Sequence, residues 1–111
     1  MKTVDELREA IRVVFAEWEK LPRLPSHWNV VGVSDTAHDR YTLNHINYKN
    51  DRYDSSLLAH LEIRDGKIWI LTDNTEEGVA TDLVREGVPK SLIVLGFYIP
   101  ATREAGEFAV A

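Results

Sequence analysis

Apolar and polar positions follow two periods along this 111-residue chain, and the change of period predicts the order of its elements. Near the N-terminus, apolar residues recur at steps of three and four, as they do on one side of a helix. This stripe consists of Val4, Leu7, Ile11, Val14, Trp18 and Leu21, with Phe15 widening it. Thr3 and Glu6 match a capping box at its start, and Pro22 and Pro25 end it. The pattern predicts an N-terminal amphipathic helix.

Four strands are predicted next, and they span residues 28–34, 40–48, 56–64 and 67–72. The dipeptide Asp65-Gly66 joins the last two strands and predicts a two-residue hairpin turn, because both central residues of that turn need a positive φ. This turn sets the register of the hairpin. The predicted pairs are Arg64 with Lys67, Ile63 with Ile68, Glu62 with Trp69, Leu61 with Ile70 and His60 with Leu71.

The predicted register divides the hairpin into two faces. The face expected against the helices carries Leu57, Ala59, Leu61, Ile63, Ile68 and Ile70. The second face carries Leu58, His60, Glu62, Trp69 and Leu71. A face open to solvent rarely combines a Trp with two Leu, so the second face predicts a contact with a partner protein or with another copy of the chain. The alternative is that the last strand or the C-terminal tail covers it.

A second helix and a fifth strand complete the predicted fold. Thr75 is the expected N-cap of this helix, and Gly87 and Pro89 mark its end. Its buried stripe is predicted to be Val79, Ala80, Leu83 and Val84. Residues 92–99 are apolar at both odd and even positions, so both sides of a strand there would be apolar. This pattern predicts a strand that is buried on both faces or lies at an interface. The fold class is therefore α+β, with an antiparallel sheet of about five strands, an N-terminal helix and a second helix before the last strand.

The composition is typical of one globular domain that covers residues 1–111, with 44% hydrophobic residues. We find no apolar run of membrane-spanning length and no leader, which predicts a cytoplasmic protein without membrane contact. The absence of cysteine excludes disulfides, thiolate metal sites and a Cys nucleophile. The net charge is −5 and the isoelectric point is about 5.3, so direct binding to nucleic acid is not expected. Any action on DNA is expected to proceed through a partner.

Several groups of residues suggest chemistry, but simpler interpretations are favoured for each. Asp54, Asp65 and Lys67 have the order of a nuclease metal site, yet Asp65 is required by the hairpin turn. The segment Asn74-Thr75-Glu76 could hold an anion at a helix start, yet two glutamates there oppose an anion. We therefore predict no catalytic, metal or cofactor site from these residues.

Two further clusters contain histidine. Asp35, His38 and Asp39 could ligate a metal, but their spacing is typical of a solvated turn. His60 could act as a general base with Glu62 or Asp35, although no nucleophile has a defined relation to it. A hydrogen-bonded histidine on a half-buried face is the favoured interpretation of His60.

Five motifs in combination resemble those of a known family. They are D-x5-Y-x-L from Asp35, H-x-E-I-R-D-G-K-I-W-I from His60, D-x-T-E-x-G-x-A from Asp73, G-V-P-K-x-x-I-V-L-G-F from Gly87 and R-x4-F-A-V-A from Arg103. With them the chain resembles the XisI family, the fdxN-element excision controlling factors found mainly in cyanobacteria. The resemblance covers nearly the whole chain. The chain departs from the family pattern at Ser91, Tyr98 and Gly106, where the family tends to have an acidic residue, His and Thr.

The resemblance implies an accessory role in programmed DNA rearrangement, in which a separate recombinase exchanges the strands. It also implies a XisH-like partner with a restriction-endonuclease-like fold. We therefore expect a non-enzymatic regulatory subunit that forms a homo-oligomer or a complex with a XisH-like protein. The predicted interface residues are Leu58, His60, Trp69, Leu71, Tyr98, Arg103 and Phe108. The alternatives are a small ligand-binding or hydrolytic enzyme that uses His60 with nearby carboxylates, and a domain that binds DNA directly but weakly.

Overall fold

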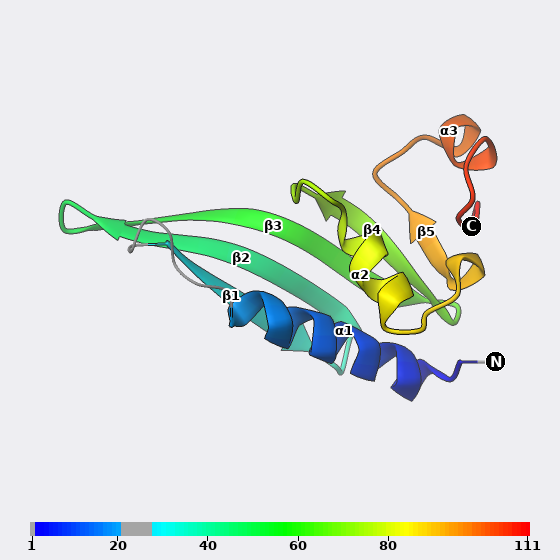
Figure 1. The fold of residues 1–111 in the computed structure, drawn as a ribbon, viewed down its shortest axis with the longest axis horizontal. Coiled ribbons are helices and arrows are strands. Elements are labelled where there is room, and N and C mark those ends of the chain that lie inside the picture. Colours follow the sequence, from blue (N-terminus) through cyan, green and yellow to red (C-terminus); the bar gives the residue numbers. More distant parts are fainter. Residues whose placement is uncertain (1, 21–27) are drawn as a thin grey trace.

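A five-stranded sheet with the strand order β1-β2-β3-β4-β5 forms the centre of the fold (Figure 1). The computed structural model of the chain describes residues 2–20 and 28–111. Its elements are α1 (Val4–Glu19), β1 (Trp28–Asp35), β2 (Arg40–Lys49), β3 (Arg52–Arg64), β4 (Lys67–Asp73), α2 (Val79–Arg85), the 3₁₀ helix Lys90–Leu92, β5 (Ile93–Leu95) and α3 (Pro100–Glu104). The predicted single α+β domain, with one helix before the sheet and a second before its last strand, is confirmed.

The sheet is mixed rather than wholly antiparallel. Strands β1 to β4 form an antiparallel meander, whereas β5 pairs with β4 in parallel. A parallel pair needs a crossover between its strands, and α2 lies in that crossover. The turn at Asp65-Gly66 has φ values of 51° and 74°, which confirms the predicted hairpin. A second turn with two positive φ values, at Asn50 and Asp51, joins β2 to β3.

Helix α1 begins with the predicted capping box. The backbone N–H of Glu6 donates to Oγ1 of Thr3 over 3.2 Å, and the N–H of Thr3 donates to Oε1 of Glu6 over 3.0 Å. The buried side chains of α1 are Leu7, Ala10, Ile11, Val14 and Phe15. Trp18 is half-buried, and Leu21, Pro22 and Pro25 lie outside the described residues. None of the described helices is long and apolar enough to cross a membrane.

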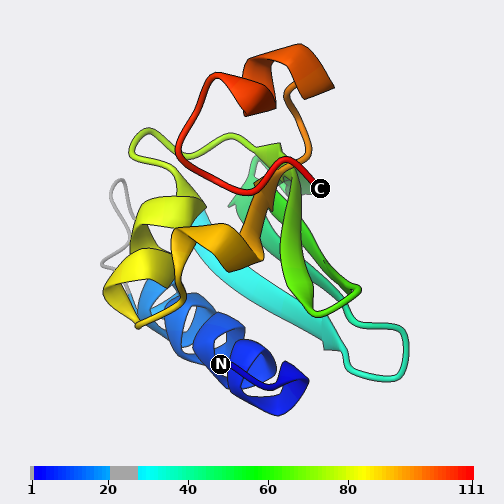
Figure 2. The same cartoon turned by 90° about the vertical axis from the view of Figure 1, so that its right-hand side faces the viewer.

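The hydrophobic core lies between the sheet and the two helices α1 and α2. Residues from α1 and α2 join one buried cluster with Leu43 of β2, Leu61 of β3 and Ile70 of β4. The face of the sheet turned away from α1 and α2 is called the outer face below. Helix α3 and the C-terminal tail lie apart from α1, beside β5 (Figure 2). The chain therefore covers the two faces of the sheet unequally.

Two β-bulges correct the predicted assignment of residues to faces. The pairs from Arg64 with Lys67 to Leu61 with Ile70 are as predicted, but His60 pairs with Thr72 and not with Leu71. A second bulge lies between β2 and β3, where Leu43 pairs with Ala59 and Asn44 pairs with Leu57. Each bulge adds one residue to a strand, and one added residue reverses the alternation beyond it.

The second bulge exchanges the faces of two neighbouring leucines. Leu58 packs against the hydrophobic core, although it was predicted on the second face. Leu57, predicted in the core, is 36% exposed and belongs to the outer face, because its partner Asn44 follows the buried Leu43. Ala59 and Leu61 are fully buried, as predicted.

Helix α2 starts later than predicted, and Thr75 is not its N-cap. The helix begins at Val79, whose backbone N–H donates to the Asp73 carboxylate over 2.8 Å. The same carboxylate accepts from the N–H and the hydroxyl of Thr75, at 3.0 and 2.6 Å. Asp73, at the end of β4, therefore holds the segment that leads into α2. The predicted helix end is confirmed, since Gly87 has a φ of 95° and follows the C-cap.

The predicted fifth strand over residues 92–99 is shorter in the structure, where β5 contains only Ile93–Leu95. Val94 is fully buried because the C-terminal tail covers it through a bridge with Ala109. The chain leaves the strand at Gly96, and the N–H of Phe97 donates to the carbonyl of Ile70. The apolar residues beyond Gly96 are therefore exposed, and Ile99 is exposed by 68%.

Gly96 lies where the chain passes closest to β4, so we expect Gly96→Ala to destabilise the fold. A Cβ at this position would lie 3.0 Å from Cδ2 of Leu71, 3.2 Å from the carbonyl oxygen of Ile70 and 3.3 Å from Cε3 of Trp69. Relief of these contacts requires the backbone to shift, which should lower the free energy of unfolding by about 1–3 kcal/mol in urea denaturation.

Gly106→Ala is the matched control, because the nearest atom to its Cβ would lie 3.7 Å away. This variant should unfold at nearly the wild-type urea concentration. Equal midpoints for the two variants would show that the contacts around Gly96 do not limit stability.

Candidate protein-interaction surface

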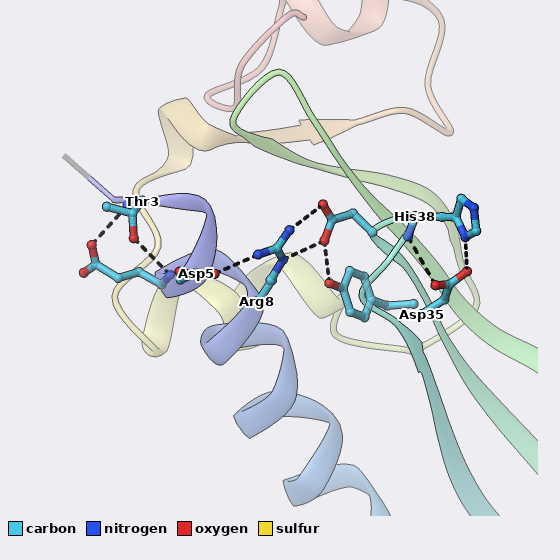
Figure 3. A network of polar contacts seen from close by, with 8 residues as sticks. Thr3, Asp5, Arg8, Asp35 and His38 are labelled. Carbon is cyan, nitrogen blue, oxygen red and sulfur yellow. Dashed lines mark hydrogen bonds and ion pairs between the residues drawn. The ribbon is translucent and has the colours of Figure 1, made fainter.

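An arginine on α1 connects that helix to the turn between β1 and β2 (Figure 3). Nε and Nη2 of Arg8 donate to the two carboxylate oxygens of Asp39, over 2.8 and 3.0 Å. Nη1 of Arg8 donates to Asp5 over 2.7 Å, and the hydroxyl of Tyr41 donates to Asp39 over 2.8 Å. The Arg8 guanidinium, together with the Tyr41 hydroxyl, lowers the pKa of Asp39. Burial, together with the hydrogen bond to Asp39, raises the pKa of Tyr41 to about 12.

The residues considered as a metal cluster do not converge. Asp39 is bound to Arg8, whereas Asp35 accepts a hydrogen bond from the backbone N–H of His38 and lies 2.8 Å from its Nδ1. The contact with His38 lowers the pKa of Asp35. Within the described part of the chain, no three His, Asp or Glu side chains are grouped as metal ligands. These residues are used by the β1–β2 turn and its contact with α1.

The residues with nuclease-like order are also separated. Asp54 lies near the start of β3 and Asp65 follows its end, so the 13-residue strand separates the two carboxylates. Nζ of Lys67 donates to the backbone oxygen of Ala111 over 2.6 Å. In the segment considered for anion binding, the Asn74 side chain donates to the carbonyl of Leu57. The Lys67 contact holds the C-terminal tail against β4, and the Asn74 contact holds the loop before α2 against β3.

Nε2 of His60 lies 3.4 Å from Oε2 of Glu62. Glu62 also lies 3.3 Å from the Arg64 guanidinium, so its carboxylate contacts both His60 and Arg64. Asp35, the second carboxylate considered for His60, binds His38 instead. The His60 side chain is therefore part of a row of polar contacts along β3 that runs through Glu62 to Arg64.

Trp69 lies on the outer face of β4 beside two arginines. The guanidinium carbon of Arg64 is 5.2 Å from the centre of the Trp69 ring, and that of Arg103 is 5.4 Å away. Both distances are typical of cation–π contacts. Arg103 comes from α3 and forms no ion pair with any described residue, and its buried Nε has no hydrogen-bond partner there.

An exposed apolar segment lies next to this tryptophan. Phe97 and Tyr98 have ring centres 4.5 Å apart, and both side chains are exposed. Tyr98 and Arg103 line a small hollow of about 50 Å³ together with Phe108. We call the group formed by Trp69, Leu71, Phe97, Tyr98, Ile99 and Arg103 the Trp69 surface.

The structure brings together four of the seven predicted interface residues, which are Trp69, Leu71, Tyr98 and Arg103. His60 lies further along the outer face, and Phe108 packs against the core under Nζ of Lys90. Leu58 lies on the helix side, where it lines a hollow of about 380 Å³ beside Trp18. Phe97 and Ile99 were not among the predicted interface residues, because both were assigned to a strand over residues 92–99 that was expected to be buried on both faces or to lie at an interface. Gly96 and Pro100, which flank them, are the signal that could have found them.

This fold and this surface define a small α+β domain whose exposed apolar and cationic side chains suit contact with another protein. The family model of the XisI protein matches residues 1–110, and the chain belongs to the XisI family.

Two solved structures are similar to the chain over nearly its whole length. A XisI-like protein from Anabaena variabilis ATCC 29413 has a TM-score of 0.80 and 25% identity, covering 99% of this chain and 100% of its own. The fdxN element excision controlling factor XisI from the same organism has a TM-score of 0.72 and 26% identity, covering 95% and 96%. A comparison with curated proteins found no match.

The link between Arg8 and Asp39 should make stability depend on pH. The folded pKa of Asp39 is lowered, so its stabilising contribution is present above the unfolded pKa and is lost as pH falls through the folded pKa. Both side chains are partly exposed, so Asp39→Asn should lower the free energy of unfolding by about 1 kcal/mol at neutral pH. The difference from wild type should vanish in strong acid.

Asp65→Asn is the matched control for this variant. Both Asp39 and Asp65 have a positive φ, which asparagine tolerates, but Asp65 has no ion pair in the described part of the chain. Thermal unfolding across pH should give a flatter acid limb for Asp39→Asn alone. Parallel curves for wild type and Asp39→Asn would contradict the proposed linkage.

Proposed function

We propose that this chain is a non-enzymatic accessory factor that controls excision of a DNA element by binding another protein. The observation that carries the proposal is the Trp69 surface, where exposed aromatic side chains adjoin an arginine without a carboxylate partner among the described residues. Membership of the XisI family and similarity to a protein named as an excision controlling factor support the role in excision.

The partner in this proposal is a XisH-like protein that presents a carboxylate and an apolar group to the Trp69 surface. Aromatic residues and arginine are the residue types that most often contribute large shares of binding energy at protein interfaces. A carboxylate placed on Arg103 would form a charge-assisted hydrogen bond next to the tryptophan ring. Tyr98 and Ile99 would supply the apolar rim of the same contact.

The proposed factor acts on DNA only through this partner. The chain carries 18 acidic and 13 basic residues. Many of the described cations are already paired, as Arg8 is with Asp39 and Lys90 is with Glu107. A surface of this kind offers few free cations for phosphate groups. The factor would therefore act as a regulator of the protein that carries out the DNA chemistry. We expect it to do so in the cytoplasm.

Arg103→Glu tests the proposed contact by reversing the charge at its centre. The variant should bind the XisH-like protein at least about tenfold more weakly in a titration of the two purified proteins, because a carboxylate would then face a carboxylate. Circular dichroism should confirm that the variant is folded.

Arg52→Glu is the matched control, since Arg52 is exposed at the far end of the sheet and has no ion pair with a described residue. It should bind like the wild type. Absence of any complex between the wild-type chain and the XisH-like protein would refute the partner, and equal affinities of the two variants would refute the surface.

A further inference from the structure

The small hollow beside the Trp69 surface lies where the end of β5, helix α3 and the C-terminal tail meet (Figure 2). Its volume is about 50 Å³, and Leu95, Phe108 and Ala109 give it apolar walls. Arg103 lines the same hollow, while its guanidinium carbon lies 5.4 Å from the centre of the Trp69 ring. An apolar space therefore adjoins the cation of the Trp69 surface.

Backbone hydrogen bonds and core contacts hold the walls of this hollow in place. The N–H of Ala109 donates to the carbonyl of Ile93 over 2.9 Å, and the N–H of Tyr98 donates to the carbonyl of Leu95 over 3.1 Å. Phe108 packs against the hydrophobic core. The hollow is therefore formed before a partner arrives, and a preformed site loses little free energy to ordering when a side chain enters it.

Charge selects what can occupy the hollow. Among the described residues that line it, Arg103 alone is charged. The nearby carboxylate of Glu107 is held by Nζ of Lys90, 2.8 Å away. Glu104, the next residue of α3, forms no ion pair with Arg103 in the described part of the chain. The electrostatic complement of this site is a carboxylate that comes from another protein.

Volume limits the occupant further. A water-sized group takes about 10–15 Å³ of such space, so the hollow of about 50 Å³ holds about three to five non-hydrogen atoms. That is one short side chain, and an indole or phenol ring is too large. A leucine would fit but would leave Arg103 without a carboxylate. A glutamate supplies the carboxylate together with two methylene groups, and it buries more apolar surface against the walls than an aspartate does.

We propose that the hollow is the socket for one glutamate side chain of the partner protein. Its methylene groups lie against Leu95 and Phe108, and its carboxylate binds the guanidinium of Arg103. The socket rests on the proposed function, because the partner is the protein that binds the Trp69 surface. A single residue then supplies both the negative charge and the apolar group that this surface requires, since its stem packs while its charged end pairs.

Gly106→Leu tests the socket, because Gly106 lines the hollow and Arg103 stays unchanged. A Cβ at this position would lie 3.7 Å from the nearest atom, so a side chain can begin there without a clash. The variant should bind the XisH-like protein at least about tenfold more weakly in a titration of the two purified proteins. Ala105→Leu is the matched control, because Ala105 is exposed and does not line the hollow. It should bind like the wild type, and both variants should keep the wild-type circular dichroism spectrum.

A double-mutant cycle identifies the occupant of the socket. Each exposed glutamate of the XisH-like protein is replaced by glutamine and combined with Arg103→Gln. One of these replacements should couple to Arg103→Gln, so that the double variant loses at least about tenfold less affinity than the product of the two single losses. Equal affinities of Gly106→Leu and Ala105→Leu, or the absence of a coupled glutamate, would overturn the socket. The proposed function would still stand if Arg103→Glu weakens the complex, whereas absence of any complex with the wild-type chain would overturn both.

Discussion

The alternation of side chains along β3 decides which of its residues enter the hydrophobic core and which lie on the outer face. This strand has 13 residues and pairs with β2 on one side and β4 on the other. Bulges next to Leu58 and Leu71 reset the alternation, so that Leu58 fills the core while Leu57 is left outside. Without these resets, strict alternation from Leu61 would bring Leu57 to the helix side and remove it from the outer face. The burial of Leu58 and the exposure of Leu57 both depend on this arrangement.

The chain covers the two ends of its outer face differently. Near β5, the tail bridges to Val94 through Ala109 and brings the core-packed Phe108 with it. Near the β2–β3 tip, the described residues provide no equivalent cover for Tyr48 and Tyr53. Between these two ends, the Glu62 carboxylate contacts both His60 and Arg64. The tip of the β2–β3 hairpin is therefore more exposed than the end of the sheet beside β5.

Local signals in the sequence predicted the elements well, whereas contacts between distant segments were not predictable from them. The capping box of Thr3 and the turn at Asp65-Gly66 depend on neighbouring residues, and both are confirmed. The bulge at Leu58 depends on how β2 pairs with β3, which periodicity alone does not encode. Asp73 replaced Thr75 as the acceptor at the start of α2 because its carboxylate reaches forward from the end of β4. The exposed segment after Gly96 was not predictable for the same reason, because its contacts with β4 join residues more than twenty positions apart.

The parallel pairing of β5 with β4 makes β5 a late element in folding. The meander from β1 to β4 closes through short turns, while β5 joins only after the chain has passed through α2, at a greater cost in loop-closure entropy. Trp69 belongs to the early part, but Arg103 belongs to the late part. A nascent or partly unfolded chain therefore displays the tryptophan without its arginine from α3, and only a fully folded molecule carries all of the proposed Trp69 contact surface.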